Sequence, residues 1–128
     1  MNPAKQVFAA SFLKSSPFEK GQLRDYFMDR DLGFAKATQG MVTALVHRAH
    51  KPCPAGGTGR HQHGVAFQMV YVLKGWCVFE FEGQGTVRFE TGDSWLQPPG
   101  IKHTTLDYSA DCELLEIVMP AEFETKDA

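Results

Sequence analysis

Two histidines one residue apart stand in the segment GRHQHGVAFQ, residues 59–68, and their spacing suits metal binding. In an extended strand, residues i and i+2 point to the same face and lie roughly 7 Å apart along the chain. His61 and His63 would therefore direct two imidazoles at one point, where metal–nitrogen bonds of about 2.1 Å can meet. Such pairs also occur on protein surfaces without a metal, so a metal site here requires ligands from elsewhere in the chain.

A third histidine follows a Pro-Pro-Gly turn further along. The upstream segment has the spacing H-x-H-x4-Q-x6-G, which runs from His61 and His63 through Gln68 to Gly75. The downstream segment has the spacing G-x5-P-x-G-x2-H, formed by Gly92, Pro98, Gly100 and His103. Over about residues 41–120, these two segments together resemble the two signature motifs of the cupin superfamily.

The chain departs from the family pattern at three positions. Gln68 stands where the family usually has a metal-binding glutamate, and Asp107 stands where the second motif has asparagine. Gly56 precedes His61 by four intervening residues in place of five. Only the first departure affects the chemistry, because an amide has nearly the shape of a carboxylate but no charge and cannot take up a proton.

The resemblance implies that His61, His63 and His103 are metal ligands. Gln68 either binds the metal through its carbonyl oxygen or hydrogen-bonds a metal-bound water or a neighbouring residue, and the sequence leaves both roles open. Imidazole suits several divalent ions, and Fe(II) or Zn fits best, with Mn or Ni as further candidates. The other two histidines of this region, His47 and His50, match no family position. Both are expected at the surface, with an inward position beside the metal ligands as the alternative for His47.

Alternating and β-branched residues from position 41 onward predict an all-β fold. Examples are MVTALVHRA at 41–49, FQMVYVLKG at 67–75 and the hairpin WCVFEFEGQGTVRFETGD at 76–93. Seven or eight short strands with frequent turns indicate a sandwich or barrel, and the resemblance implies a double-stranded β-helix, or jelly roll. We expect residues 1–40 to form an N-terminal arm with an extra strand or turn, 41–123 the cupin barrel and 124–128 a C-terminal tail.

Strand alternation also predicts which side chains line a pocket beside the histidines. If His61 and His63 face inward, Gln68, Val70 and Val72 share one face of their strand. Phe79 belongs to the apolar face of the hairpin. Trp95 and Gln97 share one face of a short strand that ends at the Pro-Pro turn. Trp95 either lines the cavity or packs in the core, and Gln97 either reaches a bound ligand or lies on an exposed edge. An apolar, aromatic pocket of this kind would take a small enolisable or aromatic oxygenated compound.

Three histidines without a carboxylate resemble the site of the diketone-cleaving dioxygenases among the cupins. The leading hypothesis is therefore a mononuclear Fe(II) dioxygenase. A non-redox Zn or Mn cupin, acting as an isomerase, cyclase or hydrolase, is the first alternative, and a non-catalytic cupin that binds a small molecule is the second. No residue is identified as a catalytic base or nucleophile.

Composition excludes several partners. The net charge of −2 and the pI near 6.2 give no electrostatic case for nucleic acid, and no apolar run approaches the ~18 residues of a membrane span. Three cysteines without CxxC spacing fit a reducing cytoplasm, with Cys77 and Cys112 as small core residues. The resemblance implies a homodimer, with the arm that carries Phe8, Phe12 and Phe18 among its candidate contacts.

Overall fold

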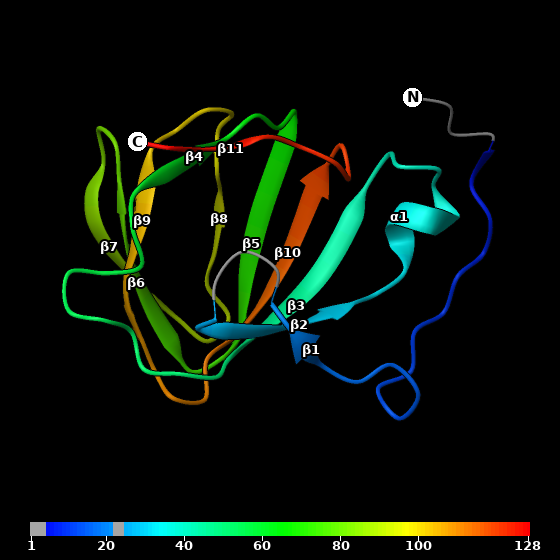
Figure 1. The fold of residues 1–128 in the computed structure, drawn as a ribbon, viewed down its shortest axis with the longest axis horizontal. Helices are drawn as coiled ribbons and strands as arrows, with labels where there is room; N and C mark the ends of the chain where they lie inside the picture. Colours follow the sequence, from blue (N-terminus) through cyan, green and yellow to red (C-terminus); the bar gives the residue numbers. More distant parts are fainter. Residues whose placement is uncertain (1–4, 22–24) are drawn as a thin grey trace.

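The computed structural model describes residues 5–21 and 25–128 as two antiparallel sheets that face each other (Figure 1). The larger sheet has the strand order β1 (Glu19–Lys20), β2 (Phe27–Asp31), β3 (Thr43–Ala49), β10 (Glu113–Met119), β5 (Phe67–Lys74) and β8 (Ser94–Leu96). The smaller sheet has the order β11 (Thr125–Asp127), β4 (His61–His63), β9 (His103–Tyr108), β6 (Trp76–Phe81) and β7 (Gly85–Glu90). The predicted all-β jelly roll is confirmed, and one short helix, α1 (Phe34–Ala37), precedes β3.

The alternation read from the sequence sets the inner face of strand β5. Gln68, Val70 and Val72 are buried, whereas Tyr71 and Leu73 are exposed by 39% and 42%. The same rule holds on β6, where Cys77, Phe79 and Phe81 are all buried. Because the inner faces of both sheets meet in the barrel, Gln68 points toward the same interior as the apolar hairpin residues.

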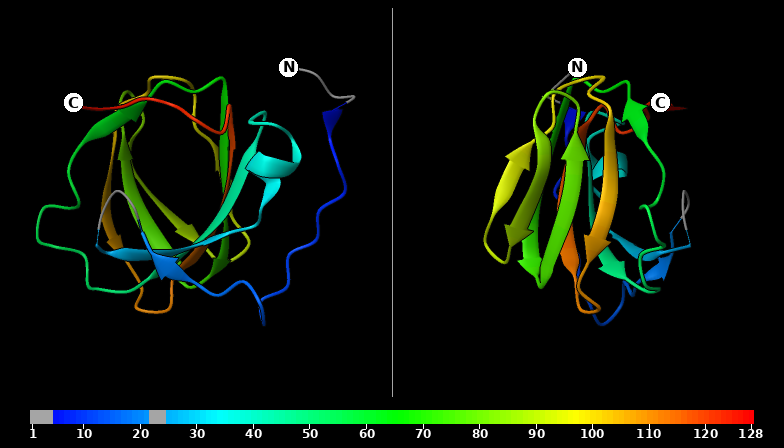
Figure 2. Two further views of the ribbon diagram at one scale, coloured as in Figure 1. Left: turned by 45° about the vertical axis from the view of Figure 1, so that its right-hand side comes forward. Right: turned by 90° about the vertical axis from the view of Figure 1, so that its left-hand side faces the viewer.

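The apolar core extends from one end of the barrel to the residues beside His103 and Gln68 at the other. Val72 pairs with Leu114 and Cys77 pairs with Tyr108, and all four belong to one buried cluster. At the opposite end of the same strands, His103 pairs with Phe81 and Gln68 pairs with Val118. Figure 2 shows the two sheets enclosing this shared interior.

Residues before position 41 extend the larger sheet. Strand β2 pairs with β3, and β1 pairs with β2, so both lie at one edge of that sheet. Ahead of them, the amide of Val7 donates to the carbonyl of Ala37 at 2.9 Å. Phe8 and Phe12 on this segment are exposed by 94% and 67%. None of the helices among the described residues is long and apolar enough to cross a membrane.

The C-terminal segment, expected as a tail over residues 124–128, contains a short strand. Residues 125–127 form β11, which pairs with β4 through Thr125 and His63, Lys126 and Gln62, and Asp127 and His61. Strand β4 has only three residues, and its ladder with β9 is the single pair His61 and His103. The second ladder supplies partners for the other edge of β4, which would otherwise expose unpaired backbone groups.

The inward orientation of β5 can be tested by two substitutions on neighbouring residues. Val72→Ala should destabilise the protein by about 2 kcal/mol, because it leaves a cavity in the core. Leu73→Ala should change stability by less than about 0.5 kcal/mol, because that side chain faces outward. Chemical denaturation of both variants measures the difference, and equal losses would contradict the orientation of this strand.

Candidate metal centre

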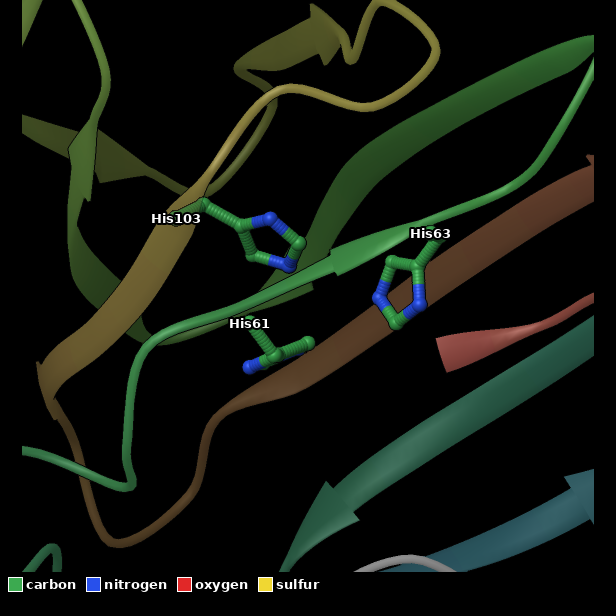
Figure 3. Close-up of side chains that lie close together, drawn as sticks. All are labelled: His61, His63 and His103. Atoms are coloured by element: carbon green, nitrogen blue, oxygen red, sulfur yellow. The ribbon is translucent and has the colours of Figure 1, made fainter. Parts of the chain in front are cut away.

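Three histidines converge inside the barrel (Figure 3). His61 and His63 come from β4, and His103 is the first residue of β9, directly opposite His61 in the ladder. Their ring centroids lie 4.2–5.0 Å apart. One ring nitrogen from each histidine lies within 4.8 Å of the others. The structure therefore brings together the three residues that the sequence motif singled out.

Each of the three rings is held by a hydrogen bond at Nδ1. His61 Nδ1 lies 3.1 Å from the carbonyl oxygen of Gly59, and His103 Nδ1 lies 3.0 Å from that of Ile101. A carbonyl only accepts, so Nδ1 carries the proton in both rings and Nε2 keeps its lone pair. His63 Nδ1 lies 2.9 Å from the Thr125 hydroxyl of β11, which can accept in the same way. Tethers of this type orient histidines that bind metals through the other nitrogen.

The donor set fits a divalent metal ion. Nitrogens that share one ion with bonds of about 2.1 Å lie within about 4.2 Å of one another, so these rings need only a small adjustment. Burial and the neighbouring imidazoles lower the pKa of His63 and of His103 to about 4. Both rings are therefore neutral at physiological pH, which is the form that binds a metal.

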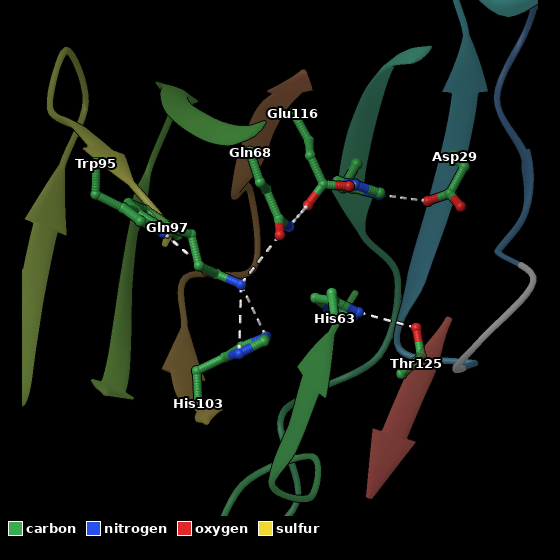
Figure 4. Close-up of polar contacts among 9 residues, drawn as sticks. Asp29, His63, Gln68, Trp95, Gln97, His103, Glu116 and Thr125 are labelled. Atoms are coloured by element: carbon green, nitrogen blue, oxygen red, sulfur yellow. Dashed lines mark hydrogen bonds and ion pairs between the residues drawn. The ribbon is translucent and has the colours of Figure 1, made fainter. Parts of the chain in front are cut away.

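Gln68 and Gln97 lie beside the histidines and are linked to each other (Figure 4). Both side chains are nearly fully buried, with exposed fractions of 2% and 3%. The Gln97 amide nitrogen donates to the Gln68 carbonyl oxygen at 3.3 Å and also lies 3.2 Å from His103 Nε2. Trp95 Nε1 donates to the Gln97 carbonyl oxygen at 3.1 Å. Gln97 thus connects both the indole and Gln68 to the histidine cluster.

A carboxylate that the sequence analysis missed contacts Gln68. Glu116 on β10 accepts a hydrogen bond from the Gln68 amide nitrogen at 2.8 Å. Its other oxygen lies 3.0 Å from His47 Nε2, and His47 Nδ1 lies 2.7 Å from the Asp29 carboxylate. The expectation that His47 lies at the surface was wrong, because β3 places it on the inner face, where its side chain is 22% exposed.

Opposite charges are paired within this group, because His47 contacts the carboxylates of both Glu116 and Asp29. Burial alone would lower the pKa of His47, but the carboxylates of Glu116 and Asp29 outweigh it and raise that pKa to about 10. Burial works against ionisation of Glu116, but His47 and the Gln68 amide together keep the pKa of Glu116 below its usual range. At neutral pH, an imidazolium therefore sits between two carboxylates.

Strand parity could have revealed this group. Glu116 lies between Leu114 and Val118, which are both buried, so a charged residue stands at an inward position of β10. Its contacts with Gln68 and His47 depend on how β10 pairs with β5 and β3. That pairing joins segments that are far apart in the chain, and no local motif indicates it.

The other predicted pocket residues lie in and against the core. Val70, Val72 and Phe79 belong to the buried apolar cluster, and Trp95 packs against it. The Trp95 ring stacks on Phe89, with the centroids 4.2 Å apart. These four residues therefore form the apolar floor beneath the polar group, and their contact with a bound compound stays a prediction.

The model of the cupin domain family matches residues 53–118, just over half of the chain. The chain belongs to the cupin family. That match spans both histidine motifs, and the fold and the three-histidine cluster agree with it. No curated protein sequence matches the chain.

Solved cupin-like structures share this fold at low sequence identity. The polyketide cyclase RemF from Streptomyces resistomycificus has a TM-score of 0.76 and 18% identity, over 95% of this chain and 86% of that chain. KdgF from a Halomonas species has a TM-score of 0.70 and 19% identity, over 89% and 96%. A sugar phosphate isomerase of the cupin superfamily from Silicibacter pomeroyi has a TM-score of 0.72 and 18% identity, over 92% and 80%. These likenesses concern the fold.

The tether on His63 gives a test of the centre. Thr125→Val keeps the shape of the side chain but removes the hydroxyl that holds His63 Nδ1, so the affinity for a divalent metal should fall by roughly 10-fold. Chelator competition measures the dissociation constant. Lys126→Ala, at the next position of β11, is the matched control and should leave the affinity unchanged. An unchanged affinity in Thr125→Val would contradict the role of this tether.

Proposed function

We propose that this cupin is a mononuclear Fe(II) dioxygenase that acts on a small enolisable or aromatic oxygenated compound. The observation that carries the proposal is the donor set of three histidines without a carboxylate. Gln68, at the family's fourth ligand position, is neutral, and the Glu116 carboxylate beside it is shared with His47. A divalent ion held by these groups keeps its full charge and favours substrates that bind through anionic oxygen atoms, such as an enolate.

The residues of the chain would bind and orient. When bound, Fe(II) would supply the redox chemistry with O₂, and imidazole ligands suit this ion. His61, His63 and His103 would hold it through Nε2, with their rings fixed by Gly59, Thr125 and Ile101. Aromatic rings lie against two of the imidazoles, since Phe123 is 5.3 Å from His63 and Phe81 is 6.5 Å from His103. These rings place apolar surface beside two of the three imidazoles.

A non-redox Zn or Mn enzyme, an isomerase, cyclase or hydrolase, is the second candidate. The observation that favours it is Glu116, an ionised carboxylate on the inner face whose charge acts on both His63 and His103. Lewis-acid chemistry needs a proton acceptor near the metal, and Glu116 is a candidate for it. Among proteins of the same fold, one is a polyketide cyclase and another a sugar phosphate isomerase.

Oxygen consumption separates the two candidates. Protein loaded with Fe(II) should consume O₂ in the presence of β-diketones or related enols, and His103→Ala should lose this activity by at least about 100-fold. The same compounds are then tested anaerobically with Zn- or Mn-loaded protein in D₂O, with carbon-bound deuterium followed by NMR. Exchange faster than in a sample without protein, together with no O₂ uptake by Fe(II)-loaded protein in air, would replace the dioxygenase with the non-redox enzyme. Binding without either reaction would favour a non-catalytic small-molecule cupin.

A homodimer in the cytoplasm is part of the same proposal. Large apolar side chains are exposed on the outer face of the larger sheet and on the N-terminal arm, among them Tyr71, Leu96, Val7, Phe8 and Phe12. Surfaces of this kind commonly mark protein–protein contacts. The unpaired cysteines, two of them buried, suit a reducing compartment. Size-exclusion chromatography with light scattering should give twice the mass of one chain, and a monomer at micromolar concentration would contradict the dimer.

A further inference from the structure

The polar side chains beside the histidines form a chain of hydrogen bonds that runs in one direction. Trp95 donates to Gln97, Gln97 donates to Gln68, and Gln68 donates to Glu116 (Figure 4). Among the described residues, no buried side-chain nitrogen or oxygen atom lacks a hydrogen-bond partner. This satisfied network restricts the orientation of both amides.

The two ends of this chain fix its direction. An indole N–H only donates, so Gln97 must turn its oxygen toward Trp95 and its nitrogen toward Gln68. An ionised carboxylate only accepts, so Gln68 must turn its nitrogen toward Glu116. A flip of the Gln68 amide would place its oxygen against the Glu116 carboxylate and its nitrogen against the Gln97 nitrogen. Both contacts would then be repulsive.

We propose that Glu116 is a positioning residue that orients the Gln68 amide, so that its carbonyl oxygen faces the histidines and serves as a fourth, neutral metal donor. The proposal rests on the metal site of the proposed function and assigns Gln68 the ligand role that the sequence left open. The Gln68 oxygen accepts one hydrogen bond, from Gln97, and has a second lone pair available. The separation of 2.8 Å between the Gln68 nitrogen and Glu116 fits a charge-assisted hydrogen bond.

Glu116 is itself held in place from two neighbouring strands. Its backbone pairs with Leu45 of β3 and with Val70 of β5, and its second oxygen is bound by His47. His47 is in turn held by Asp29 of β2. In most cupins, a ligand glutamate would bring a negative charge directly to the metal. Here that charge stands on Glu116, and the Gln68 amide lies between it and the histidines.

Glu116→Gln tests this role, because it keeps the shape but replaces the acceptor-only group with an amide that no longer imposes one orientation on Gln68. The affinity for Zn²⁺ should fall by roughly 10-fold, as measured by chelator competition. The visible absorption spectrum of bound Co²⁺ should also change, because it reports the donor atoms and the geometry of the ion. Glu113→Gln on the same strand removes the same charge from a residue paired with Arg48 at 3.5 Å, and both readouts should stay at the wild-type values.

The double variant Gln68→Glu/Glu116→Gln exchanges the two groups and gives a rescue test. The carboxylate then stands at the ligand position and the amide donates to it, so Zn²⁺ should bind at least as tightly as in the wild-type protein. Thermal unfolding of each metal-free variant shows whether it is folded.

The outcomes separate this proposal from the proposed function. Wild-type protein without measurable affinity for Zn²⁺ would overturn both. A wild-type protein that binds Zn²⁺, together with Glu116→Gln at an unchanged affinity and an unchanged Co²⁺ spectrum, would overturn only the positioning role. A double variant that binds no more tightly than Glu116→Gln would overturn the assignment of Gln68 as a metal donor.

Discussion

The position of strand β4 is the constraint on which the site depends. This strand is three residues long and carries two of the three histidines. One edge meets β9 through the single pair His61 and His103, which places the third imidazole directly beside the first. The other edge is covered by β11, which also supplies the Thr125 hydroxyl that holds His63. The backbone pairing that builds the smaller sheet therefore also assembles the three nitrogens.

The larger sheet contributes the charge around the site. Gln68 brings an uncharged amide to the position where the cupin pattern usually has a carboxylate. A negative charge stands on Glu116 of the neighbouring strand, where it contacts both Gln68 and His47. In the proposed site, a charge held on Glu116 and not on the Gln68 oxygen would preserve the +2 charge of a bound ion while still fixing the direction of the amide. The glutamine at the family's glutamate position would therefore favour substrates that bind the ion through anionic oxygen atoms.

The sequence predicted the features that depend on local spacing, namely which side chains share a face and where a strand begins. The alternation i, i+2 placed His61 and His63 on one face, and the turn at 98–100 placed His103 at the start of a strand. The same parity placed Gln68 on the inner face and left Gln97 open between a pocket position and an exposed edge, and both side chains are buried. These predictions succeeded because each depends on residues only a few positions apart.

The remainder depends on pairing between distant segments. His47, Glu116 and Gln68 meet only because β3, β10 and β5 are neighbours in the sheet. His47 was expected at the surface because no family position matches it, and Glu116 was overlooked within an apolar run. Strand β11 has three exposed polar residues, Thr125, Lys126 and Asp127, so no hydrophobic alternation marks it. Its pairing with β4 follows from the fold, and nothing in residues 125–127 themselves indicates it.

The metal content of the protein tests the central claim most directly. Untagged protein purified without chelators would be analysed for metals beside the double variant His61→Ala/His63→Ala. The account predicts about one divalent ion per wild-type chain after loading with Fe(II) or Zn²⁺, and none above background in the variant. A wild-type protein that holds no ion after loading, or a variant that holds as much as the wild type, would contradict the three-histidine centre.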